Sequence, residues 1–300
     1  MLKRNQFIWN FYKESKGIIP NCLKNVRYND VVIDNPYYED AADKLPKVFY
    51  LSLFPTFLEP EFIDEKNYNL KKINHYGFSG SAMKVSGSDS VEAYLKTYTK
   101  RQLRVNLRRS MERLEKAYSV KYEYNYGDIS DEKCNMLTNA LHVMISQRFR
   151  SRIKEHVFMM EWEQNIKNLA ASIREKKSSM FVVYANEKPI GIGVNRHIHN
   201  TILFSETHSF DENFIEFGLG HIDNYLLLNW AIRNNYPFVD LGAGLTSFKR
   251  SWCNSTYEME YLIHYKKESV LAYLIAQYEI GQIHIKNTLK SLKDKLKKQK

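Results

Sequence analysis

Three closely spaced apolar segments in the second half of the chain constrain its fold most. They read SMFVVYA at 179–185, PIGIGVNRHI at 189–198 and TILFSETHSF at 201–210, with only three and two residues between them. Segments rich in β-branched and aromatic residues are typical of strands, and connections this short join antiparallel neighbours. The sequence therefore predicts an antiparallel three-stranded meander.

Helical patterns surround this meander. In the segment 90–118, apolar side chains recur every three or four positions at Leu103, Leu107, Met111 and Leu114, which predicts one helix with an apolar stripe. The meander and its neighbours together predict an α+β (α/β) fold, with a mostly antiparallel central sheet flanked by helices. Further helices are expected at 130–150, 159–176, 217–235 and 268–297, and further strands at 47–54, 120–126, 237–242 and 256–265.

The composition limits the class of protein. With 44% hydrophobic and 14% aromatic residues the chain can bury a core, which excludes a disordered protein. No apolar run is long enough to span a membrane, and the N-terminal segment does not resemble a signal peptide, so we expect a cytoplasmic protein. Cys22, Cys134 and Cys253 lie far apart and predict neither a disulfide framework nor a metal site.

The net charge of +10 is concentrated in residues 96–116 and in the last dozen residues. In the first segment Lys100, Arg104 and Arg108 are spaced four apart and share a helix face. Like charges stacked in this way repel, so an anionic counterpart is expected. This counterpart could be formed by carboxylates of the fold or by a phosphate-bearing substrate. A nucleic acid is a third partner, because 21 tyrosines could stack on bases, but no known nucleic-acid-binding module is visible.

The basic C-terminal segment IKNTLKSLKDKLKKQK has its own pattern. It places Leu289, Leu292 and Leu296 on one helix face with lysines around them. A helix of this kind either packs on its domain and continues into solvent, or lies on an anionic membrane surface. Both interpretations stay open at this point.

Half of the glycines cluster in one part of the chain. A glycine inside a strand or at a helix start weakens the element, so it usually indicates close approach of the backbone or a positive φ. The pair at 218 and 220 opens a helix, whose free N–H groups and dipole can bind a phosphate. The cluster therefore predicts a ligand cleft. Of the 12 glycines, six form three Gly-x-Gly pairs at Gly191/Gly193, Gly218/Gly220 and Gly242/Gly244.

The last of these pairs follows a strand that ends in a carboxylate. The segment VDLGAGLT at 239–246 is similar to the first glycine motif of SAM-dependent methyltransferases, but Thr246 replaces the third glycine. Only 56 residues follow Gly244, too few for the remaining βα units of a doubly wound fold. Together with the antiparallel meander upstream, this excludes a methyltransferase and a dinucleotide-binding protein.

From about residue 98 to 255 the chain resembles the GNAT-like acyltransferases related to the Fem peptidoglycan-branching ligases, which bacterial polysaccharide and cell-envelope loci often carry. The basic helix TKRQLRVNLRRSMERLEK, the meander followed by FGLG, and the closing segment FVDLGAGLTSFKRSW carry the resemblance in this order. Two positions depart from the family pattern. Ile215 stands where the phosphate loop has Arg or Gln, and Phe248 stands where a tyrosine commonly precedes the lysine.

The resemblance implies a domain division and a reaction. Residues 1–88 would be an N-terminal segment and a candidate degenerate second GNAT-like lobe, 89–267 the acyltransferase domain, and 268–300 a basic C-terminal helix. The implied reaction moves an acyl group, with acetyl the first expectation, directly from acyl-CoA to an amine or hydroxyl. The acceptor would be a sugar nucleotide, a glycan or another anionic cell-envelope intermediate. Acetyl-CoA or another acyl-CoA would be the co-substrate, and no metal is expected.

The resemblance also implies where the reaction takes place. In the GNAT fold two neighbouring strands splay and the pantetheine arm of the donor pairs with the exposed edge, which here implicates 201–210 and 237–242. On the first strand, alternation places Glu206 and His208 on one face about 7 Å apart, as a general base and its orienter. The residues implied in donor binding are Gly218, Leu219, Gly220, Gly242 and Gly244.

A further carboxylate and a set of substrate contacts complete the implied site. Asp240 ends an apolar strand and is a catalytic candidate, although a clamp with Lys249 or Arg104 as its partner is the favoured role. Contacts with the substrate are expected from Arg104, Arg108, Lys249 and Trp252.

Two alternatives to an acyl-CoA enzyme stay open. A Fem-like ligase would take its acyl group from aminoacyl-tRNA, which Ile215 and the charge of +10 favour. It would bind tRNA with a steep salt dependence. A non-catalytic protein with a GNAT fold would keep the basic helix and bind no acyl donor.

Overall fold

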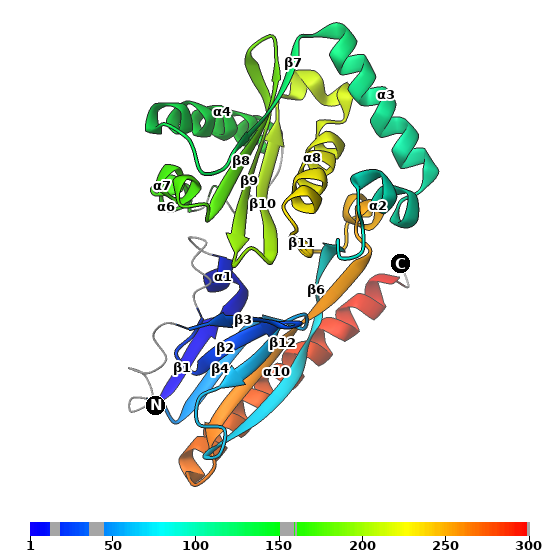
Figure 1. The fold of residues 1–300 in the computed structure, drawn as a ribbon. Coiled ribbons are helices and arrows are strands. Elements are labelled where there is room, and N and C mark those ends of the chain that lie inside the picture. Colours follow the sequence, from blue (N-terminus) through cyan, green and yellow to red (C-terminus); the bar gives the residue numbers. More distant parts are fainter. Residues whose placement is uncertain (13–18, 36–44, 151–158, 160, 299–300) are drawn as a thin grey trace. The chain divides into compact units, whose positions relative to one another are not determined.

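The structure is a computed structural model that describes residues 1–12, 19–35, 45–150, 159 and 161–298 (Figure 1). The described residues form two compact units. The first unit combines residues up to Gly80 with Thr256 onward, and the second contains Ser81–Ser255. These units differ from the three expected segments, 1–88, 89–267 and 268–300. The reason is that the last strand and the C-terminal helix belong to the first unit.

The first unit contains two groups of strands. One has the order β1 (Leu2–Gln6), β4 (Val48–Pro55), β12 (Ser255–Lys266) and β6 (Tyr68–Lys84). In it β1 and β4 are parallel, whereas β4 and β12 are antiparallel. The other is a separate antiparallel sheet of β3 (Val31–Asp34), β2 (Leu23–Tyr28) and β5 (Glu59–Phe62).

Two helices belong to this unit. In the short helix α1 (Phe7–Tyr12) the Phe7 ring lies 4.6 Å from the Phe54 ring of β4. The long helix α10 (Val270–Lys298) packs through Ala272, Ala276 and Ile283 against a core that includes Val48 and Ile263. None of the helices in the described part of the chain is long and apolar enough to cross a membrane.

The second unit is built on the predicted meander. Its strands have the order β11 (Phe238–Ala243), β10 (Ile202–Phe210), β9 (Lys188–Ile198), β8 (Ser178–Ala185) and β7 (Val120–Asn125). Neighbours from β7 to β10 are antiparallel, and β10 and β11 are parallel. The predicted α+β fold with a mostly antiparallel sheet is therefore confirmed.

Helices cover both faces of this sheet (Figure 1). The first face carries α8 (Leu219–Arg233), whose Leu219 and Leu226 share a core with Phe181 and Val183 of β8. The second face packs against α4 (Asp131–Phe149) and α7 (Leu169–Arg174), in a core with Met180 of β8. The helices α2 (Val91–Tyr98) and α3 (Arg101–Ala117) lie on the side of α8, and the short helix α6 (Trp162–Ile166) precedes α7.

Two expected helices are each interrupted. The segment 90–118 forms α2 and α3, because Thr99 takes an extended conformation between them. Thr99 Oγ1 donates a hydrogen bond to Leu95 O at 2.7 Å, which ends α2. The described part of 159–176 similarly contains α6 and α7 in place of one helix.

The apolar stripe of α3 makes a testable contribution to stability. Leu114 is completely buried in the core of the first face. Replacing a fully buried leucine with alanine costs about 2–5 kcal/mol, since the removed atoms leave a cavity. We expect Leu114→Ala to lower the free energy of unfolding by this amount in a urea titration. The exposed Arg109→Ala on the same helix should change it by less than about 0.5 kcal/mol, and equal effects would contradict the packing.

Candidate functional site

The parallel strands β10 and β11 separate near their C-terminal ends. Their pairing covers Ile202 with Phe238, Leu203 with Val239 and Phe204 with Asp240. Beyond these three pairs β10 continues to Phe210 and β11 to Ala243. These are the two strands that were expected to splay. Backbone groups near both strand ends are therefore not used for pairing β10 with β11.

A β-bulge in β10 accounts for this separation. The register with β9 shifts between Ser205 and Thr207, so Glu206 has no partner residue on β9. A bulge adds one residue to a strand and bends it locally. Ser205 pairs with Asn195 and His208 with Gly193, and because Asn195 and Gly193 are two residues apart, Ser205 and His208 share a face.

The bulge contradicts one expectation. Alternation placed Glu206 and His208 on the same face, but Glu206 instead contacts Arg196, whose neighbour Val194 belongs to the core of the second face. His208 faces the side of α8, where a Cβ on Gly220 would lie 3.8 Å from His208 Nε2. The expectation is wrong because strict alternation does not survive a bulge.

Glu206 is held in a buried ion pair. Arg196 Nε donates to Glu206 Oε2 at 2.7 Å, and the two side chains are only 4% and 17% exposed. Arg196 Nη1 also donates to Ser178 Oγ at 3.1 Å. Burial raises the pKa of Glu206, and the guanidinium of Arg196 opposes that rise. The carboxylate thus anchors the bulge, and its predicted role as a base stays a prediction.

Asp223 of α8 is a carboxyl group that the sequence analysis missed. Its Oδ1 lies 2.7 Å from the position that a Cβ on Gly193 would occupy. Only a glycine leaves room for this carboxyl, and Gly193 is the cross-strand partner of His208. Asp223 and His208 therefore lie side by side on the face covered by α8. The available sequence signal was Gly193 itself, which was read only as part of a glycine cluster.

The protonation of Asp223 is unusual. Burial raises the pKa of its carboxyl to about 7. Among the described residues it has neither a hydrogen bond nor an ion pair, although the residue keeps partial exposure to solvent. A carboxyl with this pKa can both accept and donate a proton near neutral pH.

The start of α8 brings two predicted features together. Gly218 is left-handed with φ 60° and links the 3-10 helix η3 (Glu212–Phe217) to α8. A Cβ on Gly218 would lie 3.8 Å from Ser110 Oγ of the basic helix α3. From the same helix Arg113 Nη2 donates to Glu216 O at 2.5 Å. Ser110 and Arg113 of α3 therefore lie beside the start of the predicted donor-binding segment of Gly218, Leu219 and Gly220.

Asp240 and Lys249 shape the end of β11. Asp240 is completely buried, and Gly242 N donates to its Oδ1 at 2.8 Å, which fixes the turn at Gly242. Lys249 Nζ donates to Gly242 O at 3.1 Å and to Ala243 O at 2.6 Å. Burial lowers the pKa of Lys249, whereas the charge of Asp240 opposes this change. These contacts give both residues a local structural role, while a Cβ on Gly244 would meet open space.

The remaining expected substrate contacts have other partners in this structure. Arg104 Nη1 donates to Leu95 O at 3.0 Å and to Thr99 O at 2.5 Å, so it caps α2 and is not the partner of Asp240. Arg108 is 83% exposed and pairs with Glu112 on its own helix. Substrate binding by Arg104 and Arg108 stays a prediction.

Trp252 differs from its expected role because it is completely buried. It lies in α9 (Ser247–Trp252), and its Nε1 donates to His221 Nδ1 at 2.9 Å. This bond fixes the proton of a neutral His221 on Nε2, and burial lowers the pKa of His221. The ring of Phe248 lies 4.9 Å from that of His221. Trp252 therefore holds the His221 ring in place from the core and has no exposed surface for a substrate to contact.

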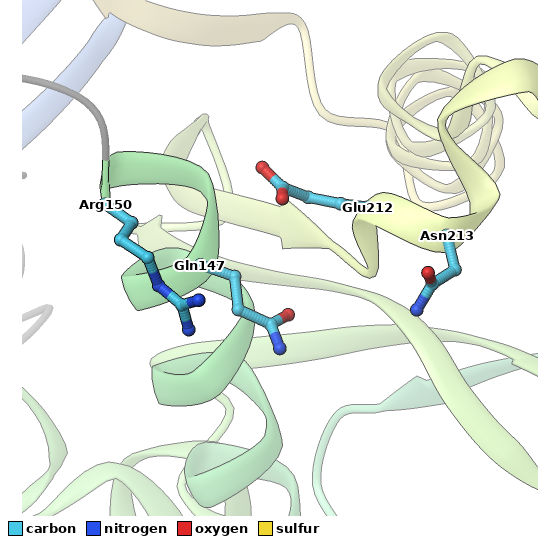
Figure 2. A pocket seen from close by; sticks show the side chains of 4 residues that line it. All are labelled: Gln147, Arg150, Glu212 and Asn213. Atoms are coloured by element: carbon cyan, nitrogen blue, oxygen red, sulfur yellow. The ribbon is translucent and has the colours of Figure 1, made fainter.

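A polar pocket of about 380 Å³ lies where η3 follows β10 (Figure 2). Gln147 and Arg150, at the end of α4, line one side, and Glu212 and Asn213 of η3 line the other. The pocket thus combines one cation, one carboxylate and two amides. In the described residues, no three His, Cys, Asp or Glu side chains are grouped to hold a metal ion.

Comparisons with known proteins agree with this architecture. A family model described as an acetyltransferase (GNAT) domain matches residues 101–250. The crystal structure of FemX is similar with a TM-score of 0.52 and 11% sequence identity, over 79% of this chain and 76% of that chain. A conserved protein of unknown function from Bacteroides thetaiotaomicron has a TM-score of 0.50 and 10% identity, over 79% and 78%. These structures show a shared fold. A search of curated proteins found no match.

The pKa of Asp223 predicts how stability depends on pH. In the folded protein this pKa of about 7 lies above the value of about 3.9 for an unfolded chain. Its stabilising effect is therefore fully present below about pH 4 and is lost as the pH rises to about 7. Relative to Asp223→Asn, which stays neutral, the wild type should lose at most about 1.4 kcal/mol of unfolding free energy per pH unit in this window.

Urea titrations of both proteins across this pH range provide the measurement. The exposed Asp128→Asn is the matched control and should follow the wild type at each pH. A difference between the wild type and Asp223→Asn that stays constant with pH would contradict the raised pKa.

Proposed function

The chain belongs to the acetyltransferase (GNAT) domain family, and from this premise we propose that it transfers an acyl group from acyl-CoA to an amine or hydroxyl. The observation that carries the proposal is the separation of β10 and β11 beside the glycine-bearing start of α8. Unpaired strand edges can bond the amides of an extended ligand as an added strand would. The first N–H groups of a helix can bind a phosphate.

Two residues at this place bear on the binding of an acyl-CoA. Gly220 lies beside His208 and Phe248, which a Cβ there would meet in van der Waals contact at 3.8 and 3.7 Å. The family's usual loop cation is absent, since Ile215 stands there, but Arg113 of α3 reaches the same loop through Glu216 O. When bound, the thioester would supply an activated carbonyl and a thiolate leaving group.

The proton transfers are assigned to His208 and Asp223. Attack on the carbonyl requires the acceptor amine or hydroxyl to lose a proton, and the leaving thiolate must gain one. His208 and Asp223 lie next to each other on the α8 face, and the pKa of Asp223 near 7 suits proton exchange at neutral pH. Glu206 holds the bulge through Arg196 and thereby orients His208.

The pocket in Figure 2 is our proposal for the acceptor. Its η3 side directly follows in the chain the strand β10, which carries His208. Arg150 can bind a phosphate or carboxylate of the acceptor, and Glu212 can bind an ammonium or a hydroxyl. This combination supports a polar, partly anionic acceptor such as a sugar nucleotide or a lipid-linked glycan.

Calorimetric titration with acetyl-CoA, longer acyl-CoAs and free CoA tests the donor. We expect saturable binding, weakened at least about tenfold in Gly220→Val, whose side chain would occupy the space beside His208. Gly281→Ala in α10 is the matched control, because a Cβ there meets nothing within 4 Å. Equal affinities in all three proteins would place the donor elsewhere.

Thioester cleavage by a panel of amines and sugars tests the assignment of residues. We expect His208→Gln and Asp223→Asn to lower kcat by about a hundredfold, and Asp223→Asn to remove a limb of the pH profile near 7. Arg150→Gln should raise KM for anionic acceptors with little effect on kcat. Full activity in both His208→Gln and Asp223→Asn would refute the assignment.

The tRNA-dependent alternative rests on two observations. Ile215 is 68% exposed where a phosphate-binding side chain was expected, and Arg108 is 83% exposed on α3. If a folded sample binds no CoA derivative, aminoacyl-tRNA binding is measured at increasing salt. A steep loss of affinity would favour the ligase, whereas binding of neither donor would favour the non-catalytic protein.

A further inference from the structure

Helix α10 carries a long apolar face that the protein leaves exposed. At 3.6 residues per turn its members fall in a band about 60° wide. Their exposed fractions range from 46% to 65%, so this band, here called the α10 stripe, faces solvent along most of the helix. The stripe comprises Leu271, Leu274, Tyr278, Ile285, Leu289, Leu292 and Leu296.

The α10 stripe is not needed to hold the helix on its own unit. The opposite side of α10 does this through Ala272, Ala276 and Ile283, which are 0%, 0% and 1% exposed. On that side Glu279 also pairs with Arg4 at 2.6 Å. Contiguous exposed apolar surface on a folded protein usually marks an interaction site. The helix therefore has one face that packs in the core of its own unit and a second face available for an interaction partner.

The positive charges beside the α10 stripe indicate which kind of partner it can bind. Residues 285–297 contain Lys286, Lys290, Lys293, Lys295 and Lys297 but one acidic residue, Asp294. On the helical wheel Lys286 and Lys293 border one side of the α10 stripe and Lys295 borders the other. Two copies packed through the stripe would bring these like charges together, which is unfavourable. A surface with dispersed negative charge is the complementary partner.

We propose that α10 docks the protein on a membrane surface that contains anionic phospholipids. The α10 stripe would enter the boundary between headgroups and acyl chains, and the flanking lysines would contact the lipid phosphates. Lysine stems can extend along the apolar surface while their ammonium groups reach the phosphates. This extends the sequence interpretation of Leu289, Leu292 and Leu296 to a face that begins at Leu271. It is independent of the proposed acyl transfer.

Sedimentation of the full chain with lipid vesicles tests this proposal. We expect binding to vesicles of equal parts phosphatidylglycerol and phosphatidylcholine, weak binding to phosphatidylcholine alone, and loss of binding as salt increases. Replacing Lys286, Lys293 and Lys295 with glutamine should reduce the partition coefficient about a hundredfold, at about fivefold for each lysine near the surface. The pair Leu289→Ser and Leu292→Ser should reduce it at least about tenfold.

Matched control variants distinguish binding through the α10 stripe from non-specific binding of the protein to vesicles. Met136→Ser with Val143→Ser removes two side chains of similar exposure, 50% and 52%, from α4, and Lys96→Gln with Lys116→Gln removes exposed charge from α2 and α3. These variants should bind vesicles as the wild type does. Unchanged circular dichroism and melting temperature in every variant would show that the fold is intact.

Two outcomes would overturn the proposal. One is binding that is the same for both vesicle compositions or unaffected by the stripe variants. The other is the absence of vesicle binding together with a concentration-dependent dimer that Leu289→Ser dissociates, which would assign the stripe to a second copy of the chain.

Discussion

The buried ion pair between Arg196 and Glu206 is the interaction on which the candidate site depends. A carboxylate enclosed in a protein is costly unless a cation and further hydrogen bonds compensate it, and Arg196, itself bonded to Ser178, meets this need. The pair holds the extra residue of β10 toward the second face of the sheet. His208 is thereby turned toward α8, and the pairing of β10 with β11 ends just before the bulge. One bulge thus creates the open strand edges and orients the imidazole beside them.

Small residues around this bulge determine what can approach it. Gly193 leaves the volume that the Asp223 carboxyl occupies, whereas a Cβ on Gly220 would be in ordinary contact with His208 and Phe248. Gly193 has no positive φ, so it serves close approach rather than a turn. Gly218 and Gly242 are different, because their positive φ forms the start of α8 and the end of β11. The glycine cluster that was read from the sequence as one ligand cleft therefore has two physical functions.

Most elements predicted from local patterns are found in the structure, although two of the expected helices are interrupted, whereas features set by tertiary contacts were not foreseen. The meander, the helix that opens at Gly218 and the pair of separating strands follow from periodicity, short connections and the family resemblance. The sheet face on which Glu206 lies could not be predicted in this way, because alternation carries no information about a bulge. Asp223 was missed because its pKa depends on burial against β9, a partner far away in sequence. The division into units was also unforeseen, since β12 pairs with the N-terminal strand β4 and α10 packs against the same strands.

The two concentrations of positive charge have different environments, which argues for different anionic partners. On α3, Arg104 is bonded to carbonyls at the end of α2 and Arg113 to Glu216 O, so at the start of α8 this helix presents one fixed cation, Arg113, suited to one small anion. On α10 the lysines flank an apolar stripe in a segment, 285–297, with one acidic residue, Asp294, a combination suited to a lipid surface. If both proposals hold, docking would concentrate the enzyme where lipid-linked acceptors reside. A pocket with one arginine and one glutamate would then suffice for weak, selective acceptor binding, because surface confinement raises the effective concentration of the acceptor.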